Sequence, residues 1–169
     1  MDAAAWGFVG ALAGAIVGAG ASVTTTVVTA RSSADLQAQA DVLERTERAR
    51  AFQRDNLLAV QDALQDVARV AGRVHHEDLT AHRAGADWGK TLLSSELDEA
   101  ALVANRRLTA LVERIQDDSL REEIRATHSE FTWIAMARSQ SDAEAHMAAG
   151  GEMFLAAMGH LGQVLRGLY

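Results

Sequence analysis

The sequence contains no cysteine and no proline, and aromatic residues make up only 5% of its 169 residues. Without cysteine the chain can form neither disulfide bonds nor thiolate metal sites, and it has no cysteine nucleophile. Without proline, nothing obliges a helix to end. Alanine, leucine, glutamate, glutamine, aspartate and arginine dominate after residue 33, and most of them favour helices. We therefore predict an all-α fold.

Positive charge is also in short supply, because 16 basic residues stand against 23 acidic ones and give a net charge of -7. Phosphate backbones are bound by basic surfaces. Nucleic acid is therefore not an expected partner. Lys90 is the one lysine beside 15 arginines, and this skew, together with the abundant alanine, indicates a GC-rich coding sequence of the actinobacterial kind.

Charge is absent altogether between Asp2 and Arg31, a stretch of 28 residues. At ~1.5 Å per residue, a helix of this length exceeds the roughly 30 Å hydrocarbon core of a bilayer. A signal peptide would carry a basic region before a shorter apolar stretch, so we expect an uncleaved transmembrane anchor over residues 1–31. Cleavage near Ala19-Gly20-Ala21 and a helix buried in a soluble protein are the alternatives.

The flanks of the anchor carry their basic residues on one side only. Arg31, Arg45, Arg48 and Arg50 follow it, and no lysine or arginine precedes it. Positive residues favour the cytoplasmic side of a membrane. We therefore predict a single-pass protein of the cell membrane whose soluble domain is cytoplasmic.

Gly10, Gly14 and Gly18 repeat every four residues within the anchor. Small residues at this spacing let two membrane helices approach closely. We predict a homo-oligomer that forms through this glycine face. The alternative is that small residues are simply frequent in membrane helices.

Residues 32–169 are predicted to form an acidic antiparallel helical bundle that begins with a long helix from about Ser33. An apolar column recurs in heptads along this helix, and Arg50 interrupts it. Periodicity fades between Gly72 and Gly89, which predicts a frayed helix end followed by a loop, together covering about 72–91. Three further helices, over about 94–115, 118–139 and from Ser141, complete an up-down bundle. The heptad residues are Leu36, Leu43, Leu57 and Leu64, with Val60, Val67 and Val74 offset by three.

The segment from Ala84 to Thr91 fits a relaxed phosphate-loop pattern that ends in Gly89, Lys90 and Thr91. In such a loop backbone amides bind phosphates, the lysine reaches the terminal phosphates and the threonine binds magnesium. The pattern requires a buried strand before the loop, whereas the residues before Ala84 are polar. A nucleotide-binding protein is therefore an alternative hypothesis, weaker than an ordinary loop before a helix.

His75, Asp78 and His82 share one helical face at spacings of three and seven residues. This arrangement would suit zinc or a similar ion. The alternative is a solvated or pH-responsive histidine cluster. A metal or ligand sensor, with the bundle as its input and the membrane helix as its relay, is the corresponding functional hypothesis.

Enzyme motifs are missing from the helical part, which lacks both HExxH and the ExxH spacing of di-iron bundles. We interpret the chain as a non-enzymatic, membrane-anchored interaction or scaffold protein without a cofactor, whose partners are the lipid bilayer, its own copies and another protein. In general plan, Met1–Arg31 followed by an arginine-rich helical remainder resembles the small membrane-associated accessory proteins of actinomycete plasmids. That resemblance implies a role in plasmid transfer and spread between cells.

Overall fold

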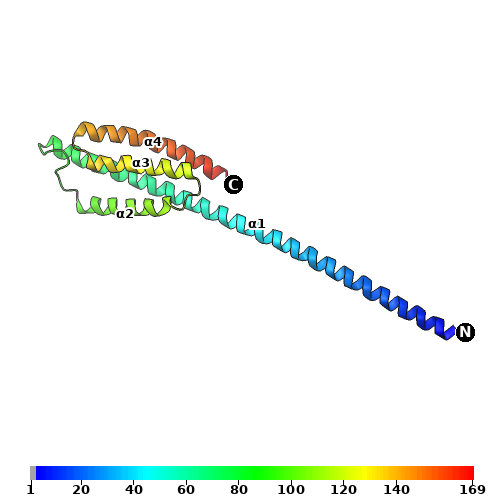
Figure 1. Cartoon of the computed structure of the whole chain (residues 1–169). Helices are drawn as coiled ribbons and strands as arrows, with labels where there is room; N and C mark the ends of the chain where they lie inside the picture. The colour runs from blue at the N-terminus through cyan, green and yellow to red at the C-terminus, as the bar shows by residue number, and fades with distance from the viewer. Residues whose placement is uncertain (1–2) are drawn as a thin grey trace. The chain divides into compact units, whose positions relative to one another are not determined.

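The computed structural model describes the backbone of residues 3–169 and the side chains of residues 33–169. Over residues 3–169 it consists of four helices and no strand, which confirms the all-α prediction (Figure 1). The helices are α1 (Ala3–Arg83), α2 (Ser95–Val112), α3 (Asp118–Met136) and α4 (Gln140–Arg166). The chain divides into two units, Met1–Arg48 and Ala49–Tyr169.

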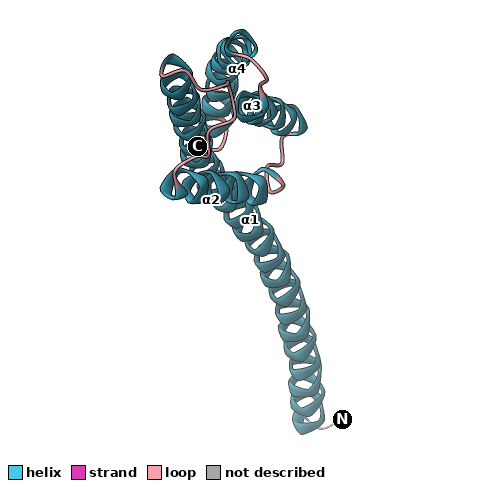
Figure 2. Cartoon of the chain, turned by 90° about the vertical axis from the view of Figure 1, so that its left-hand side faces the viewer, coloured by secondary structure: helices cyan, strands magenta, loops and turns pink. Residues whose placement is uncertain are grey.

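The second unit is a bundle in which residues 49–83 of α1 pack with α2, α3 and α4 (Figure 2). Hydrogen bonds between α1 and α2 join Asn56 to Leu111, Asp66 to Arg107 and Arg73 to Glu96. The residue numbers rise on α1 as they fall on α2, so these two helices are antiparallel. Similar pairs show that α2 and α3, and then α3 and α4, also run in opposite directions. The bundle therefore has the up-down arrangement that its short connections predict.

The core of the bundle is built on the predicted heptad residues of α1. Leu57, Val60, Leu64 and Val67 are buried, and Leu108, Ile124, Phe131 and Leu161 of the other three helices belong to the same cluster. Within the described side chains of the first unit, by contrast, Leu36 and Leu43 of the same heptad column are exposed. The heptad leucines of α1 are therefore buried in the bundle but exposed to solvent in the first unit.

Polar caps set the starts of the three shorter helices. Ser94 Oγ accepts a hydrogen bond from the Leu97 amide at 3.3 Å, Asp117 Oδ1 from Leu120 at 2.8 Å and Ser139 Oγ from Asp142 at 3.1 Å. Each bond satisfies one of the amides that the first helical turn leaves unpaired.

The predicted loop over residues 72–91 is wrong at its start, because α1 continues to Arg83 and the loop covers residues 84–94. Val74 and Asp78 are buried and Leu79 is half-buried, so the inward face of the helix continues beyond Gly72. A helical glycine costs only about 1 kcal/mol relative to alanine, which this burial offsets.

Among residues 33–169, no helix has an apolar stretch long enough to cross a membrane. The predicted anchor over residues 1–31 lies outside the residues whose side chains are described. The anchor therefore stays a prediction from the sequence.

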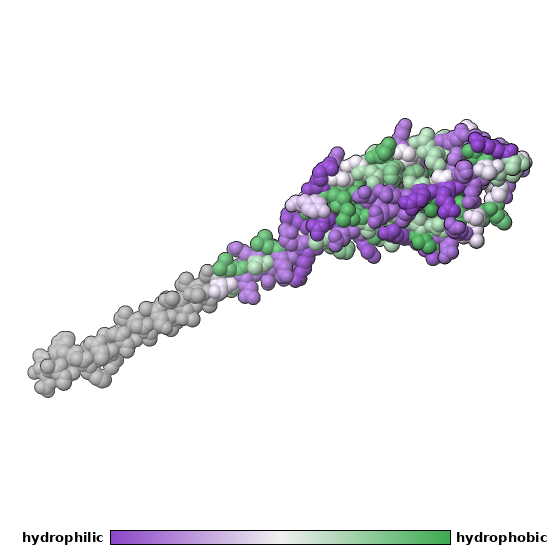
Figure 3. All heavy atoms as spheres, turned by 180° about the vertical axis from the view of Figure 1, so that it is seen from behind, coloured by the Kyte–Doolittle hydropathy of each residue, from purple (hydrophilic) through white to green (hydrophobic). Residues whose placement is uncertain are grey.

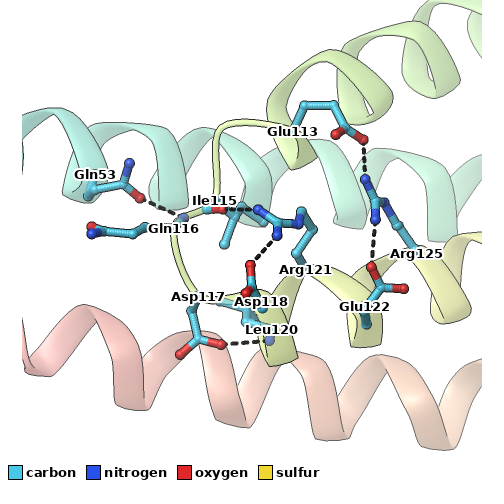
Figure 4. A network of polar contacts seen from close by, with 10 residues as sticks. All are labelled: Gln53, Glu113, Ile115, Gln116, Asp117, Asp118, Leu120, Arg121, Glu122 and Arg125. Carbon is cyan, nitrogen blue, oxygen red and sulfur yellow. Dashed lines mark hydrogen bonds and ion pairs between the residues drawn. The ribbon is translucent and has the colours of Figure 1, made fainter.

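A network of polar contacts holds the turn between α2 and α3 against α1 (Figure 4). Gln53 donates from Nε2 to the Arg114 carbonyl at 3.0 Å, and its Oε1 accepts from the Gln116 amide at 3.2 Å. Arg121 donates to the Ile115 carbonyl at 2.8 Å, and Arg125 binds the Glu113 carboxylate at 2.6 Å. Side chains thus satisfy the backbone groups of the turn, which helical hydrogen bonds do not reach.

Helices α3 and α4 pack closely where Gly150 faces Phe131. A Cβ atom placed on Gly150 would lie 2.9 Å from a carbon of the Phe131 ring. Gly159, on the same helix, would meet nothing within 4 Å. Glycine is therefore required sterically at the first position and not at the second.

Replacing Gly150 or Gly159 by alanine should show whether a side chain is tolerated at each position. We expect Gly159→Ala to stabilise the fold by up to about 1 kcal/mol through helix propensity. Gly150→Ala gains the same propensity but forces the Phe131 ring to move, and overpacking costs about 1–3 kcal/mol. Chemical denaturation of both variants measures the difference. Equal stability of the two variants would contradict the close packing.

Candidate functional site

His75, Asp78 and His82, the three residues predicted as metal ligands, lie in the last turns of α1, and both histidines contact the indole of Trp88. The Trp88 ring centroid is 5.7 Å from that of His75 and 5.8 Å from that of His82, and the second pair meets edge to face. Trp88 is only 8% exposed and packs with Leu79, Ala137 and Ala143. The loop after α1 therefore folds back and places its tryptophan between the two histidines.

This histidine cluster differs from a metal centre in its chemistry. Residues 33–169 contain no group of three or more histidine, cysteine or acidic side chains arranged to hold a metal ion. His82 Nδ1 lies 2.9 Å from the Ala86 carbonyl oxygen, so this nitrogen carries the hydrogen that it donates. The helical face shared by His75, Asp78 and His82 thus contacts an aromatic ring and a backbone carbonyl. The metal hypothesis gains no support from this geometry.

Asp78 is the unusual member of the cluster, because its side chain is 6% exposed and forms no ion pair or hydrogen bond with a described residue. Burial raises the pKa of Asp78 above its usual value. His75 opposes this effect and Glu77 adds to it. Two further polar atoms, His75 Nδ1 and Trp88 Nε1, are also buried without a partner among the described residues. Burial at this corner of the bundle therefore disfavours the charged form of Asp78.

The raised pKa of Asp78 predicts that its charge destabilises the fold at neutral pH. A carboxyl whose pKa is higher in the folded chain than in the unfolded one contributes stability at low pH, and that contribution is lost as the pH rises through the folded pKa. Asp78→Asn removes the charge. We expect it to raise the melting temperature at pH 7, because the neutral amide avoids the cost of burying a charge.

The gain from Asp78→Asn should shrink as the pH falls through the folded pKa of Asp78, and it should fade below the usual aspartate value of 3.8, because the carboxyl is then increasingly protonated in both states. Asp87→Asn, at an exposed position in the adjacent loop, is the matched control and should leave the pH dependence unchanged. Melting curves from pH 3.5 to 8 make the comparison. A loss of stability that is equal at every pH would contradict a charge effect.

Gly89, Lys90 and Thr91 lie exposed in the loop between α1 and α2. A helix leads into this loop, whereas a phosphate loop follows a buried strand, and residues 3–169 contain no strand. Gly89 has a positive φ of 65°, and a Cβ atom there would lie 3.3 Å from the Ala137 carbonyl oxygen. The positive φ and the nearby carbonyl oxygen are structural reasons for a glycine at position 89. The nucleotide hypothesis therefore gains no support from the loop.

The start of α2 is already occupied by side chains of the chain itself. Ser94 caps the helix, and Glu77 accepts hydrogen bonds from the Ser94 hydroxyl at 3.4 Å and from its amide at 3.5 Å. A phosphate placed at this helix N-terminus would lie beside the Glu77 carboxylate. Electrostatic repulsion between the two anions disfavours that position.

A groove of about 440 Å³ runs between α1 and α2, and three arginines stand along it. Arg69 and Arg107 both bind the Asp66 carboxylate, at 2.8 Å and 3.2 Å, and Arg73 binds Glu96 at 3.4 Å. The positive charges of the groove are therefore matched by acids of the same groove. This arrangement stabilises the pair of helices more readily than it binds an external anion.

His128, His146 and His160 connect neighbouring helices, which the sequence analysis did not foresee. His146 Nδ1 lies 2.8 Å from Glu130, His160 Nδ1 lies 3.0 Å from Glu123, and His128 Nε2 lies 2.6 Å from Asn105 Oδ1. Burial lowers the pKa of His128. Partners 16 to 37 residues apart leave no local spacing signal, so these pairs become visible only once the helices are docked.

Gly10, Gly14 and Gly18 of the predicted helix-packing face lie outside the residues whose side chains are described. Their role stays a prediction. Comparison of the chain with models of protein families, with characterised proteins and with solved structures finds no match.

Proposed function

We propose that this chain is a membrane-anchored, non-enzymatic protein that associates with its own copies through the first part of α1 and presents its helical bundle to a protein partner. The observation that carries the proposal concerns residues 33–50. Every residue of this helical segment is exposed. Leu36, Val42 and Leu43 are among them, with 60–67% of each side chain accessible.

A helix that buries no apolar face is only marginally stable in water, because most helical stability in proteins comes from packing. In Figure 3 the coloured stretch of α1 next to the grey atoms carries such uncovered apolar side chains in green. A second copy of the same helix would cover them. Heptad spacing between Leu36 and Leu43 is the spacing that two-stranded coiled coils use.

The positions of the glycines around the helix axis also favour a second copy of the chain as the partner. Eighteen residues separate Gly18 from Leu36, and at 3.6 residues per turn this is five whole turns. On a continuous helix Gly18 therefore lies in phase with Leu36, while Gly14 and Gly10 lie about 40° and 80° round the helix from it. Copies anchored in the same membrane with the same orientation would meet in parallel along the face of Gly18 and Leu36, and Arg50 in the heptad column would end the apolar seam.

The polar side chains of the bundle support a structural role in place of a catalytic one. His146, His160 and His128 each bind a residue on the neighbouring helix. A histidine held in this way contributes to helix register. The cytoplasmic location of the bundle, which follows from the arginines after the anchor, is part of the same proposal.

Association of the full-length chain in detergent micelles tests the proposal. We expect wild type to form oligomers, and we expect Gly14→Leu to weaken association roughly tenfold because the larger side chain keeps the backbones apart. The double variant Leu36→Ala, Leu43→Ala should also associate more weakly than wild type, because it lacks the exposed leucines that a second helix would cover. Energy transfer between labelled copies, or sedimentation in density-matched detergent, measures the change.

Leu155→Ala is the matched control, because Leu155 is 71% exposed but lies on α4. It should leave association unchanged. The self-association proposal would be wrong if wild type were monomeric. It would also be wrong if neither the glycine variant nor the leucine variant changed the oligomer.

A further inference from the structure

Helices α2 and α3 hold together at one end and leave a cavity at the other. Arg125 binds Glu113 near their connecting turn, and His128 bonds to Asn105 at 2.6 Å about halfway along the two helices. Figure 2 shows α3 beside α4, with a wider separation between α3 and α2. A cavity of about 220 Å³ lies between α1, α2 and α3, beyond the His128–Asn105 contact.

The floor of this cavity is apolar and firmly packed. Val67, Ala71 and Val74 of α1 and Phe131 of α3 line it, and each is buried. A cavity of about 150 Å³ with such walls is large enough for benzene. The space between α2 and α3 therefore has room for a single aromatic ring or a branched alkyl group of similar size.

Two polar side chains of α2 line the same cavity, and they differ in their hydrogen bonding. Asn105 is satisfied, since its Oδ1 bonds to His128 and its Nδ2 donates to the Ala101 carbonyl at 2.8 Å. Asp98 is exposed, and its carboxylate has no ion pair or hydrogen bond with a described residue. Among the residues that line this cavity Asp98 is the one that carries a charge.

We propose that the cavity between α2 and α3 binds a small organic cation, an ammonium group attached to an apolar body about the size of one aromatic ring. The apolar body occupies the floor, and the ammonium group pairs with Asp98 at the rim. Apolar walls with a few placed polar groups are the usual construction of a small-molecule site. The proposal does not depend on self-association or on the membrane anchor.

Binding of benzylammonium to the full-length chain in a neutral detergent tests this proposal. The methionine methyl groups, labelled with carbon-13, report its position by NMR, because Met136 lines the cavity whereas Met147 and Met158 pack on the main core. The Met136 signal is identified by its loss in Met136→Leu. We expect benzylammonium to shift it saturably while the Met147 and Met158 signals stay in place.

Two further probes separate the charge from the apolar body. Benzyl alcohol, of similar size but neutral, should bind about fivefold more weakly, the difference that about 1 kcal/mol from an exposed ion pair produces. Methylammonium, which has the charge without the ring, should leave Met136 unshifted. Asp98→Asn should bring benzylammonium down to the affinity of benzyl alcohol, whereas Asp62→Asn, an exposed acid outside the cavity, should leave the preference unchanged.

Filling the cavity provides the second pair of variants. Ala135 lines it at an exposed position of α3, so Ala135→Leu should block binding without disturbing the core. Ala145→Leu, at an exposed position of α4, is the control and should bind as wild type does. Unchanged binding by Ala135→Leu would overturn the site, and equal binding of the two benzyl compounds to wild type would overturn the cation.

Two other outcomes would also overturn the proposal. A Met136 signal that moves with protein concentration in the absence of any probe would mean that a second copy of the chain covers the cavity. Equal, unsaturable shifts of all the methionine signals would mean that the probe only partitions into the micelle.

Discussion

The bundle depends on one apolar seam along α1. Leu57, Val60, Leu64 and Val67 lie at alternating spacings of three and four residues, and each is at most 4% exposed. Each of the three shorter helices contributes buried side chains to the cluster that surrounds this seam. Most helical stability in proteins comes from packing of an apolar face, so α2, α3 and α4 depend on contact with α1 and with one another. The register between α3 and α4 depends on close steric packing more than on ion pairs. Exposed ion pairs add little free energy, whereas the wrong register would bring the Phe131 ring against a side chain in place of Gly150.

Much of this fold could be predicted from the sequence, because helices and their buried faces produce patterns between residues that are close in the chain. The heptad spacing identified five buried residues of α1, although Leu36 and Leu43 of the same pattern are exposed. The three shorter helices begin within about two residues of the predicted starts. The buried heptad residues are Leu57, Val60, Leu64, Val67 and Val74. The end of α1 was misread because Gly72 and the histidines dilute the hydrophobic pattern, although Val74 and Asp78 still face inward. Polar residues on the outer face of a helix lower the average hydrophobicity of the segment. They do not show whether its inner face is still apolar and buried.

The candidate site was predictable only in part, because its members come from different elements. The shared face of His75, Asp78 and His82 followed from helical spacing. Trp88 did not, since its place between the two histidines depends on the fold of a loop with two glycines at positive φ. The cavity between α2 and α3 had no signal of its own in the sequence. It arises from the separation of two helices, and that separation reflects the sum of all contacts in the bundle and not any single motif.

The clamp at Gln53 has a mechanical consequence. One side-chain amide donates to Arg114 and accepts from Gln116, so the first turns of the bundle part of α1 are joined to a turn more than 60 residues later in the chain. A tension applied along α1 from its N-terminal side would load this amide before it reached the leucine and valine layers. Two hydrogen bonds on one rigid amide resist such a force together and fail together. Gln53 therefore ties the start of the bundle part of α1 to the α2–α3 turn, together with the Asn56–Leu111 bond one turn later.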